Sequence, residues 1–322
     1  MKRAFVAAAA AVTMFALSAC GGNAGAAQPS GGSLRKVTVG VIPIVDTAPI
    51  YLGVAGGIFK NYGLELDLKS SLLGATGTVP GVVSGQLDFG YGNALSLVTA
   101  QSKGLNLKII APGSETTGIS GHDTSAVVVM ANSNLKSPAD LGGKTVAVNT
   151  VKTLGDTTIR ETVSKAGGDA SRVKFVEVSF PDAYAALSKG QVDAAWLAEP
   201  FLTIAEKQGA RILATNFVST DDSFLLSAYF TSGKLYASDP DVVKRFTAAM
   251  KESMALAQSN PDKIRDILHT YMKVAPDVAK DLVLPRFPQE ITQHQASFQV
   301  DFAYKQGLIS APIDSASLFP VQ

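Results

Sequence analysis

The sequence has a single cysteine, Cys20, among its 322 residues. One thiol cannot form an internal disulfide, and it cannot supply the several thiolates of a structural zinc site. Because Cys20 lies close to the N-terminus, the long remainder of the chain has no thiol for nucleophilic catalysis. The fold must therefore be stabilised by burial of apolar surface, and a chain of this length can build a large core.

A surplus of charge of either sign is also lacking. The chain has 28 Lys and Arg residues against 27 Asp and Glu residues, which gives a formal net charge of +1. The basic residues form no run or stripe of the kind that follows a phosphate backbone. The sequence therefore gives no indication of nucleic-acid binding.

Short motifs of common enzyme chemistries are missing too. Gly90-Tyr91-Gly92 follows a predicted strand, but Leu95 stands where a dinucleotide-binding loop needs its third glycine. No Gly-x-x-x-x-Gly-Lys-Ser/Thr loop occurs, and the histidines (His122, His269 and His294) lack the spacing of a zinc site. We therefore expect no catalytic residues, no metal and no cofactor, and we expect His122 to lie in a polar hinge loop.

The one long apolar run is at the N-terminus. Lys2 and Arg3 precede an uncharged stretch over residues 4–17, and Ser18-Ala19-Cys20 follows. This order is typical of a secretory signal peptide, and the run is shorter than the about 20 residues that a helix needs to cross a bilayer. An ordinary signal peptide with a coincidental cysteine is one interpretation.

The small residues directly before Cys20 resemble a bacterial lipobox. This resemblance implies that residues 1–19 are removed and that Cys20 receives a lipid, which anchors the protein on the outer face of the cytoplasmic membrane or in the periplasm. Residues 20–34 are rich in Gly, Ala and Ser. That composition predicts a flexible tether between the lipid and the folded body.

Beyond the tether, β-branched runs alternate with segments of helical apolar spacing, which predicts an α/β fold with parallel sheets. The expected strands cover residues 36–42, 64–68, 87–90 and 107–110, then 143–148, 173–176, 192–196 and 211–214. The expected helices between them cover residues 50–60, 78–84 and 94–102, then 154–166, 182–189 and 200–208. The chain after residue 233 reads as helical.

A short repeat links the two rounds of strands and helices. Gly85-Gln86-Leu87-Asp88 recurs as Gly190-Gln191-Val192-Asp193, 105 residues later. In both copies the glycine ends a predicted helix, and the apolar residue begins the third strand of its round. The repeat therefore predicts two similar, doubly wound lobes.

Polar, Gly-rich loops follow the predicted strands and lead into the helices. In open α/β sheets this carboxyl edge is where ligands bind, and the helix N-termini there offer free N–H groups. Two such lobes that face each other would bring their loops together around one small solute.

Several runs along the chain, in order, resemble the nitrate/sulfonate/taurine binding-protein family. They include APIYLGVAGGIFKNYGLELDL, GVVSGQLDFGYGNALSLVTAQSKG, SPADLGGKTVAV and DAYAALSKGQVDAAWLAEPF. This family also holds riboflavin and thiamine-pyrimidine-precursor receptors and the SsuA/THI5-like, NMT1-type proteins. The resemblance covers roughly residues 35–310.

The resemblance implies a type II periplasmic-binding fold with two lobes joined by two crossover segments. Lobe 1 is expected over residues 35–124 and 232–322, and lobe 2 over residues 125–231. Such a protein closes on its solute and docks on an ABC permease driven by an ATPase. The resemblance implies a monomer that acts as a receptor.

The ligand-binding residues implied by the resemblance fall on the strand-end loops. They are Asp46, Thr47, Thr76, Tyr91, Asn93, Thr150, Lys152, Thr153, Trp196 and Glu199. For three of them a structural role is an open alternative. Trp196 suits a core as well as a ligand wall, and Asn93 and Glu199 suit helix N-termini.

The solute is narrowed to two classes. Sulfonate, taurine or nitrate is the first expectation, because such solutes are frequent in the family. Asp46 and Glu199 would repel a plain anion but would accept hydrogen bonds from an amine or a ring N–H, so a nitrogenous aromatic of the pyrimidine or flavin type is the alternative. A pyrimidine synthase of the THI5 type is less well supported, because the body of the chain has no cysteine.

Overall fold

The computed structural model describes residues 33–70 and 75–320, and the side chains of residues 75 and 76 are outside that description. The predicted signal peptide, Cys20 and most of the predicted tether therefore lie outside the described residues. None of the helices within these ranges has the length and apolarity that a membrane crossing requires.

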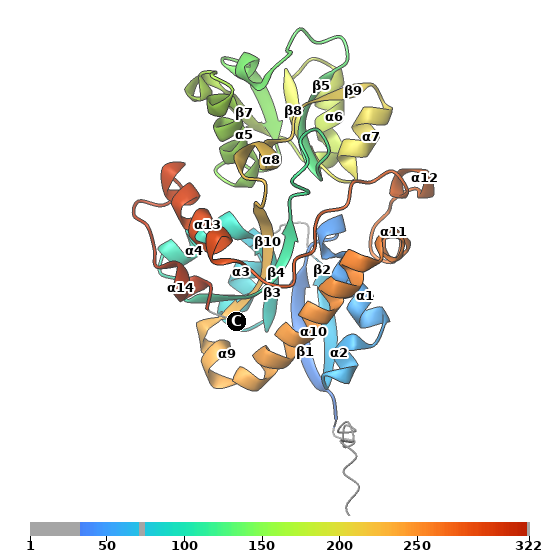
Figure 1. Ribbon diagram of the computed structural model, residues 1–322, viewed down its shortest axis with the longest axis vertical. Coiled ribbons are helices and arrows are strands. Elements are labelled where there is room, and N and C mark those ends of the chain that lie inside the picture. The colour runs from blue at the N-terminus through green and yellow to red at the C-terminus, as the bar shows by residue number, and fades with distance from the viewer. Residues whose placement is uncertain (1–32, 71–74, 321–322) are drawn as a thin grey trace, which may run out of the picture. The chain divides into compact units, whose positions relative to one another are not determined.

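The described chain contains two five-stranded sheets (Figure 1). The first has the order β2-β1-β3-β10-β4, in which β10 is antiparallel to both of its neighbours and β1 is parallel to β2 and β3. Its strands are β1 (Arg35–Val41), β2 (Leu64–Ser70), β3 (Phe89–Asn93), β4 (Leu107–Glu115) and β10 (Leu225–Ser232).

The second sheet has the order β7-β6-β8-β5-β9, and here β5 is the antiparallel strand. Its strands are β5 (Ser125–Met130), β6 (Thr145–Val148), β7 (Lys174–Glu177), β8 (Ala194–Ala198) and β9 (Ala210–Ala214). Each sheet thus repeats one plan. Four strands run in the same direction, and one antiparallel strand, β10 or β5, directly follows a crossover.

The position of β10 corrects the lobe boundary expected from the sequence. Residues 225–231 were assigned to lobe 2, but β10 pairs with β3 and β4 in the sheet of lobe 1. Chain order could not show this, because β10 enters the sheet between two strands that end more than a hundred residues earlier. The expected parallel pairing holds for β1 with β2 and β3 and for β6 with β7 and β8, whereas β10 and β5 are antiparallel to their neighbours.

Helices cover both faces of the first sheet. One face packs against a group whose buried residues form a single apolar cluster with Val37, Val39 and Val41 of β1. This group comprises α1 (Ala48–Ala55), α2 (Ile58–Asn61), α10 (Pro240–Ser259), α11 (Pro261–Leu268) and α12 (Pro276–Ala279). The other face packs against α3 (Ala75–Ser84), α4 (Ala94–Ser102), α13 (Gln293–Lys305) and α14 (Ser315–Leu318), and α9 (Gly233–Ser238) follows β10.

The long helix α10 shows how the sequence specifies one of these elements. Asp239 caps it by accepting a hydrogen bond from the backbone N–H of Val242 at 3.2 Å, and Pro240 occupies its first turn. Val242, Phe246 and Met250 recur at helical spacing and are buried against the sheet and α1.

The second sheet is also covered on both faces. α5 (Leu154–Lys165) and α8 (Asn216–Thr220) share an apolar cluster with one face, and α6 (Phe180–Ser188) and α7 (Phe201–Lys207) share another with the opposite face. Two 3-10 turns, η2 (Pro138–Leu141) and η3 (Ala170–Arg172), pack against α5. The predicted two-lobed α/β fold is confirmed.

The short sequence repeat has the same geometry in both lobes. Gly85 and Gly190 both have positive φ angles, 78° and 67°, which a glycine adopts without strain. The carboxylates of Asp88 and Asp193 each accept a hydrogen bond at 2.8 Å from a backbone N–H of the neighbouring strand, that of Thr38 on β1 and that of Thr145 on β6. The repeat therefore ties the start of β3 to β1 and the start of β8 to β6.

The strand registers show that the carboxyl edges of the two sheets meet at the crossovers. The first crossover leaves β4 at Glu115 and enters β5 at Ser125, which lies opposite Ala198 at the carboxyl end of β8. The second crossover enters β10 at Leu225, which lies opposite Glu115. Both crossovers thus join the edges at which ligands bind in such sheets.

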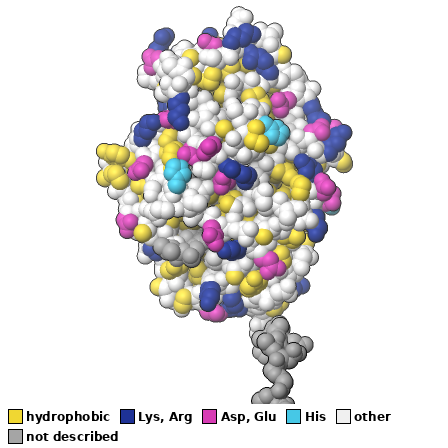
Figure 2. All heavy atoms as spheres, viewed as in Figure 1, with side chains coloured by type: hydrophobic (Ala, Val, Ile, Leu, Met, Phe, Trp, Pro, Cys, Tyr) yellow, Lys and Arg dark blue, Asp and Glu magenta, His cyan; other side chains and the backbone are white. Residues whose placement is uncertain are grey.

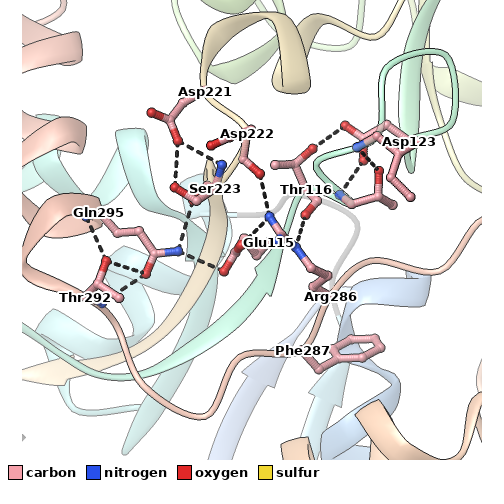
Figure 3. Close-up of polar contacts among 12 residues, drawn as sticks. Glu115, Thr116, Asp123, Asp221, Asp222, Ser223, Arg286, Phe287, Thr292 and Gln295 are labelled. Atoms are coloured by element: carbon pink, nitrogen blue, oxygen red, sulfur yellow. Dashed lines mark hydrogen bonds and ion pairs between the residues drawn. The ribbon is translucent and has the colours of Figure 1, made fainter.

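A third segment, between α12 and α13, packs across both crossovers (Figure 3). Arg286 forms an ion pair with Glu115 at 2.5 Å and an antiparallel bridge with the same residue. Its guanidinium donates to the carbonyl oxygens of Thr116 in the first crossover and Asp222 in the second. One side chain therefore holds the two crossovers side by side.

Candidate functional site

Asp46 and Thr47 lie directly after β1, in the 3-10 turn η1 (Val45–Thr47) that leads into α1. Thr47 is buried, and its hydroxyl lies 2.7 Å from the carbonyl oxygen of Ile42 and 2.9 Å from that of Ile44. The Thr47 side chain therefore stabilises the turn. Asp46 is half-buried at the carboxyl edge of the sheet.

A chain of hydrogen bonds begins at Asp46 and crosses three strands. Ser114 on β4 donates to Oδ1 of Asp46 at 2.6 Å, and the hydroxyls of Ser114 and Ser227 on β10 are 2.8 Å apart. Tyr91 on β3 donates to Ser227 at 2.6 Å. Since Tyr91 donates at one end and Asp46 accepts at the other, Ser227 must donate to Ser114.

The electrostatic environment of Asp46 is acidic. Burial raises the pKa of its carboxyl, the hydrogen bond from Ser114 opposes this rise, and the negative charge of nearby Asp123 adds to it. Asp123 itself lies buried in the first crossover, where it accepts hydrogen bonds from Thr116 and from the backbone N–H groups of Thr117 and Thr124.

Three further tyrosines surround this chain of hydrogen bonds. Tyr229 lies opposite Tyr91 in the pairing of β10 with β3, and its buried hydroxyl has no hydrogen-bond partner among the described residues. Tyr51 on α1 and Tyr271 after α11 stack with ring centroids 3.8 Å apart and planes 2° apart. Burial raises the pKa of Tyr91, Tyr229 and Tyr271, and the Asp46 charge raises each further, so these side chains form one cluster.

Two predicted ligand residues of lobe 1 lie in helices or at their ends. Asn93 is the N-cap of α4, where its side-chain oxygen accepts a hydrogen bond from the backbone N–H of Ser96 at 2.8 Å. This is the capping role that the sequence left open. Thr76 lies in α3, but its side chain is outside the described part of the chain.

On lobe 2, the loop over residues 149–153 uses its donors internally. The carboxylate of Asp156 accepts hydrogen bonds from the backbone N–H groups of Lys152 and Thr153, both at 2.9 Å. Glu177 accepts from the N–H of Val151 at 2.9 Å. The Thr153 hydroxyl donates to the carbonyl oxygen of Thr150 at 3.0 Å, whereas the Thr150 hydroxyl takes no part in these bonds.

The Lys152 side chain lies in a groove of about 460 Å³ between α4, α5 and the end of α13. Lys103 and Arg160 also line this groove. The Arg160 guanidinium is already bound to the carbonyl oxygen of Ala170 and lies over the ring of Phe175. Lys152 is exposed.

Trp196 lies on β8 with its ring inside the apolar core of lobe 2. Only 4% of its surface is exposed, and it packs against the rings of Phe180 and Phe217. Its Nε1 donates to the hydroxyl of Ser125 at 3.2 Å. A side chain at Gly155 would clash with the Trp196 ring, which explains the glycine in the first turn of α5.

Glu199 follows β8 and is buried among hydrogen-bond donors. Its Oε1 accepts from the Thr203 hydroxyl at 2.8 Å and from the backbone N–H of Val283 at 3.1 Å, and its Oε2 accepts from the N–H of Thr203. Burial raises its pKa to about 7, against the effect of these hydrogen bonds. Glu199 thus joins α7 of lobe 2 to the segment that crosses the hinge.

Three of the cluster residues that sequence reasoning missed lie on strands rather than on the predicted loops. Ser114, Ser227 and Tyr229 occupy β4 and β10, and Tyr51 and Tyr271 lie within or after helices. A signal was present only for Tyr51, which follows the turn of Asp46 by one helical turn. Within residues 33–70 and 75–320, no group of three or more His, Cys, Asp or Glu side chains is placed to hold a metal ion.

Basic and acidic side chains are interspersed over the visible face of the molecule (Figure 2). That distribution agrees with the near-zero net charge.

The described fold is that of the periplasmic binding proteins. The solved structure of the periplasmic aliphatic sulphonate binding protein SsuA from Escherichia coli matches with a TM-score of 0.75 and 19% identity, over 90% of this chain and 94% of that one. A structure titled as the desulfurization enzyme DSZB matches with a TM-score of 0.64 and 16% identity, over 89% of this chain and 97% of that one. At these identities the matches show the fold alone.

The family model described as "NMT1/THI5 like" matches residues 44–264, and the chain belongs to this family. The predicted family resemblance is thereby confirmed.

Sequence relatives carry several kinds of name. A protein of Brucella abortus (strain 2308) named as a binding protein is 30% identical over 221 residues, which are 68% of this chain and 65% of that protein. The match thus spans somewhat less than two thirds of that relative's length. Riboflavin-binding protein RibY of Chloroflexus aurantiacus is 24% identical over 91% of this chain and 86% of its own. The taurine-binding periplasmic protein of Escherichia coli (strain K12) is 23% identical over 71% of this chain and 69% of its own.

Proposed function

We propose that this chain is the extracytoplasmic solute-binding receptor of an ABC importer. It captures one small polar solute between its lobes and delivers it to a permease that is driven by an ATPase. The observation that carries this proposal is the meeting of the two carboxyl edges at paired crossovers, with a polar cluster around Asp46 on one of them. The names of the sequence relatives support it.

The same proposal includes a lipid on Cys20, a monomeric receptor and no enzymatic activity. Lobe 1 would comprise residues 35–115 and 225–320, and lobe 2 the chain between the crossovers. Motion of the lobes about the crossovers would open and close the cleft. The desulfurization enzyme among the structural relatives shows that this fold also serves catalysis, so the absence of turnover needs its own measurement.

Two solute classes are candidates. A sulfonate, taurine or nitrate agrees with the names of the sulphonate- and taurine-binding relatives. A nitrogenous aromatic agrees with the riboflavin-binding relative, and the stacked Tyr51 and Tyr271 rings at the cleft edge offer a flat apolar surface to such a solute.

A solute screen tests the receptor function. The full chain, purified in mild detergent, is heated with sulfonates, taurine, nitrate, pyrimidines and riboflavin, and each sample is analysed for chemical conversion. A receptor is stabilised in proportion to solute concentration without product formation, because a ligand that binds only the folded state raises its stability. A screen in which no solute raises the melting temperature, or in which product accumulates, argues against the proposal.

A further inference from the structure

The polar cluster of lobe 1 carries an inference that rests on the proposed function and narrows its solute. The Asp46 carboxylate is half-buried at the carboxyl edge of the first sheet, and Ser114 is the one side chain that hydrogen-bonds to it in the described part of the chain. A second acid, Asp123, is close enough to act on it electrostatically, and none of the ion pairs within the described residues includes Asp46. A partly buried carboxylate without a cation is costly unless something compensates it.

The Tyr229 hydroxyl is a second and independent observation. It is fully buried, has no hydrogen-bond partner among the described residues, and feels the charge of Asp46. Buried hydroxyls in folded proteins almost always have a partner. Tyr91, its opposite residue in the sheet, has such a partner in Ser227. The Asp46 carboxylate can therefore accept further hydrogen bonds, and the Tyr229 hydroxyl can accept or donate one.

The loop over residues 149–153, which follows β6 of lobe 2, offers few free donors to an anion. Three consecutive backbone N–H groups, those of Val151, Lys152 and Thr153, are taken by the carboxylates of Glu177 and Asp156. Helix N-termini bind anions through such groups, so the chain's own acids already occupy this part of the site.

We propose that the solute of this receptor carries a cationic nitrogen group, an ammonium or an amidinium, that pairs with Asp46, and that plain sulfonates and nitrate are rejected. The nitrogen donates to the carboxylate, and the Tyr229 hydroxyl accepts from a second N–H of the same group. The stacked rings of Tyr51 and Tyr271 lie within the same cluster and add an aromatic surface that favours a cation. A further anionic group elsewhere on the solute is compatible with this pairing.

Matched solutes test the proposal directly. Taurine carries an ammonium group that ethanesulfonate lacks, and benzylamine carries an ammonium group where benzyl alcohol has a neutral hydroxyl. Binding of all four, and of nitrate, is measured by calorimetry on the full chain in mild detergent. The cationic member of a pair is expected to bind about 10- to 100-fold more tightly than its partner, since a charge-assisted hydrogen bond typically gives a factor of that order.

Variants assign the effect to the cluster. Asp46→Asn keeps the shape of the side chain and is expected to abolish the preference for the cationic member, and Tyr229→Phe is expected to reduce it several-fold. The control is Glu65→Gln, an exposed acid on β2, which is expected to leave all affinities unchanged. Melting curves without solute show whether each variant is folded.

The outcomes separate this inference from the proposed function. If ethanesulfonate or nitrate binds as tightly as taurine, and Asp46→Asn leaves that binding unchanged or tighter, the cationic solute is excluded while the receptor stands. If none of these probes and no solute of the wider screen binds, the receptor function fails and the inference fails with it. If the cationic probes bind more tightly than their partners but Asp46→Asn binds them as tightly as the wild type does, the solute does not bind at the Asp46 cluster.

Discussion

The two edges that meet at the crossovers use their carboxylates in different ways. On lobe 1, Asp46 receives one side-chain hydrogen bond and lies beside a second acid and an unpartnered tyrosine hydroxyl. On lobe 2, Glu199 accepts three hydrogen bonds, and Asp156 accepts two from the loop before α5. Glu199 and Asp156 of lobe 2 are therefore paired with donors of their own chain, whereas the Tyr229 hydroxyl beside Asp46 has no partner in the described chain.

The same contrast holds for the aromatic residues. The Trp196 ring of lobe 2 is enclosed by Phe180, Phe217 and the first turn of α5. The Tyr51 ring of lobe 1 is half-buried and stacks on Tyr271. If this comparison is right, substitutions on lobe 2 will mainly change stability, and substitutions in the Asp46 cluster will mainly change binding.

The largest expected effect is at Trp196. Trp196→Ala removes a buried indole and its hydrogen bond, and it should lower the free energy of unfolding by about 3–5 kcal/mol. Urea denaturation followed by circular dichroism measures this change. Trp196→Phe is the milder control, and it should lower the free energy of unfolding by clearly less than Trp196→Ala. A Trp196→Ala protein that keeps its stability but loses solute binding would show that Trp196 contacts the solute.

The second effect is a pH dependence from Glu199. Its pKa is about 7 in the folded protein against 4.5 for an unperturbed glutamate, so the folded state retains a proton that the unfolded chain has released. The free energy of unfolding should therefore fall as pH rises from about 4.5 to about 7, by up to roughly 3 kcal/mol from this group, and then level off.

Glu199→Gln should flatten this slope, because glutamine does not titrate. Denaturation curves at pH 5 and pH 7.5 for the wild type and the variant provide the comparison, and Glu65→Gln on the exposed surface of β2 is the matched control. An identical slope in the wild type and in Glu199→Gln would show that the buried carboxyl titrates normally.

The third prediction concerns Tyr91 and Tyr229, which lie opposite each other on β3 and β10. Tyr91→Phe removes a satisfied hydrogen bond and should cost about 1 kcal/mol of unfolding free energy. Tyr229→Phe removes a buried hydroxyl without a partner in the described chain, and it should leave stability unchanged or raise it by up to about 1 kcal/mol. Equal destabilisation by both changes would mean that the Tyr229 hydroxyl is already satisfied in the solute-free protein.

The smallest effect separates the two copies of the repeat. Asp88→Ala and Asp193→Ala each remove an acceptor from a backbone N–H that lies 2.8 Å away. Asp88 is half-buried, whereas the Asp193 side chain is 43% exposed beside Lys144. We expect a loss of about 1 kcal/mol for Asp88→Ala and a few tenths for Asp193→Ala in thermal unfolding. A larger loss of stability for Asp193→Ala than for Asp88→Ala would show that burial of the aspartate does not decide the strength of its hydrogen bond.

The site could be predicted from the sequence only where the signal was local. The family resemblance implies a ligand role for Asp46 and Thr47, and the local signal of a turn after the first strand agrees with their position in the structure. Their partners could not be identified, because Ser114 lies 68 residues from Asp46 and Ser227 lies 136 residues from Tyr91. Glu199 was weighed as a ligand residue, yet one of its donors is Val283, 84 residues further on.

The amino-acid sequence by itself determined the α/β alternation, the two similar lobes and the absence of thiol chemistry from the body of the chain. These follow from periodicity, short turns and composition, which act within a few residues of one another. The tertiary structure alone decided that β10 joins the first sheet, that Arg286 holds both crossovers, and which carboxylates are consumed by the chain's own donors. Those outcomes depend on which distant segments lie side by side, and hydrogen bonding between such segments leaves no pattern in either segment alone.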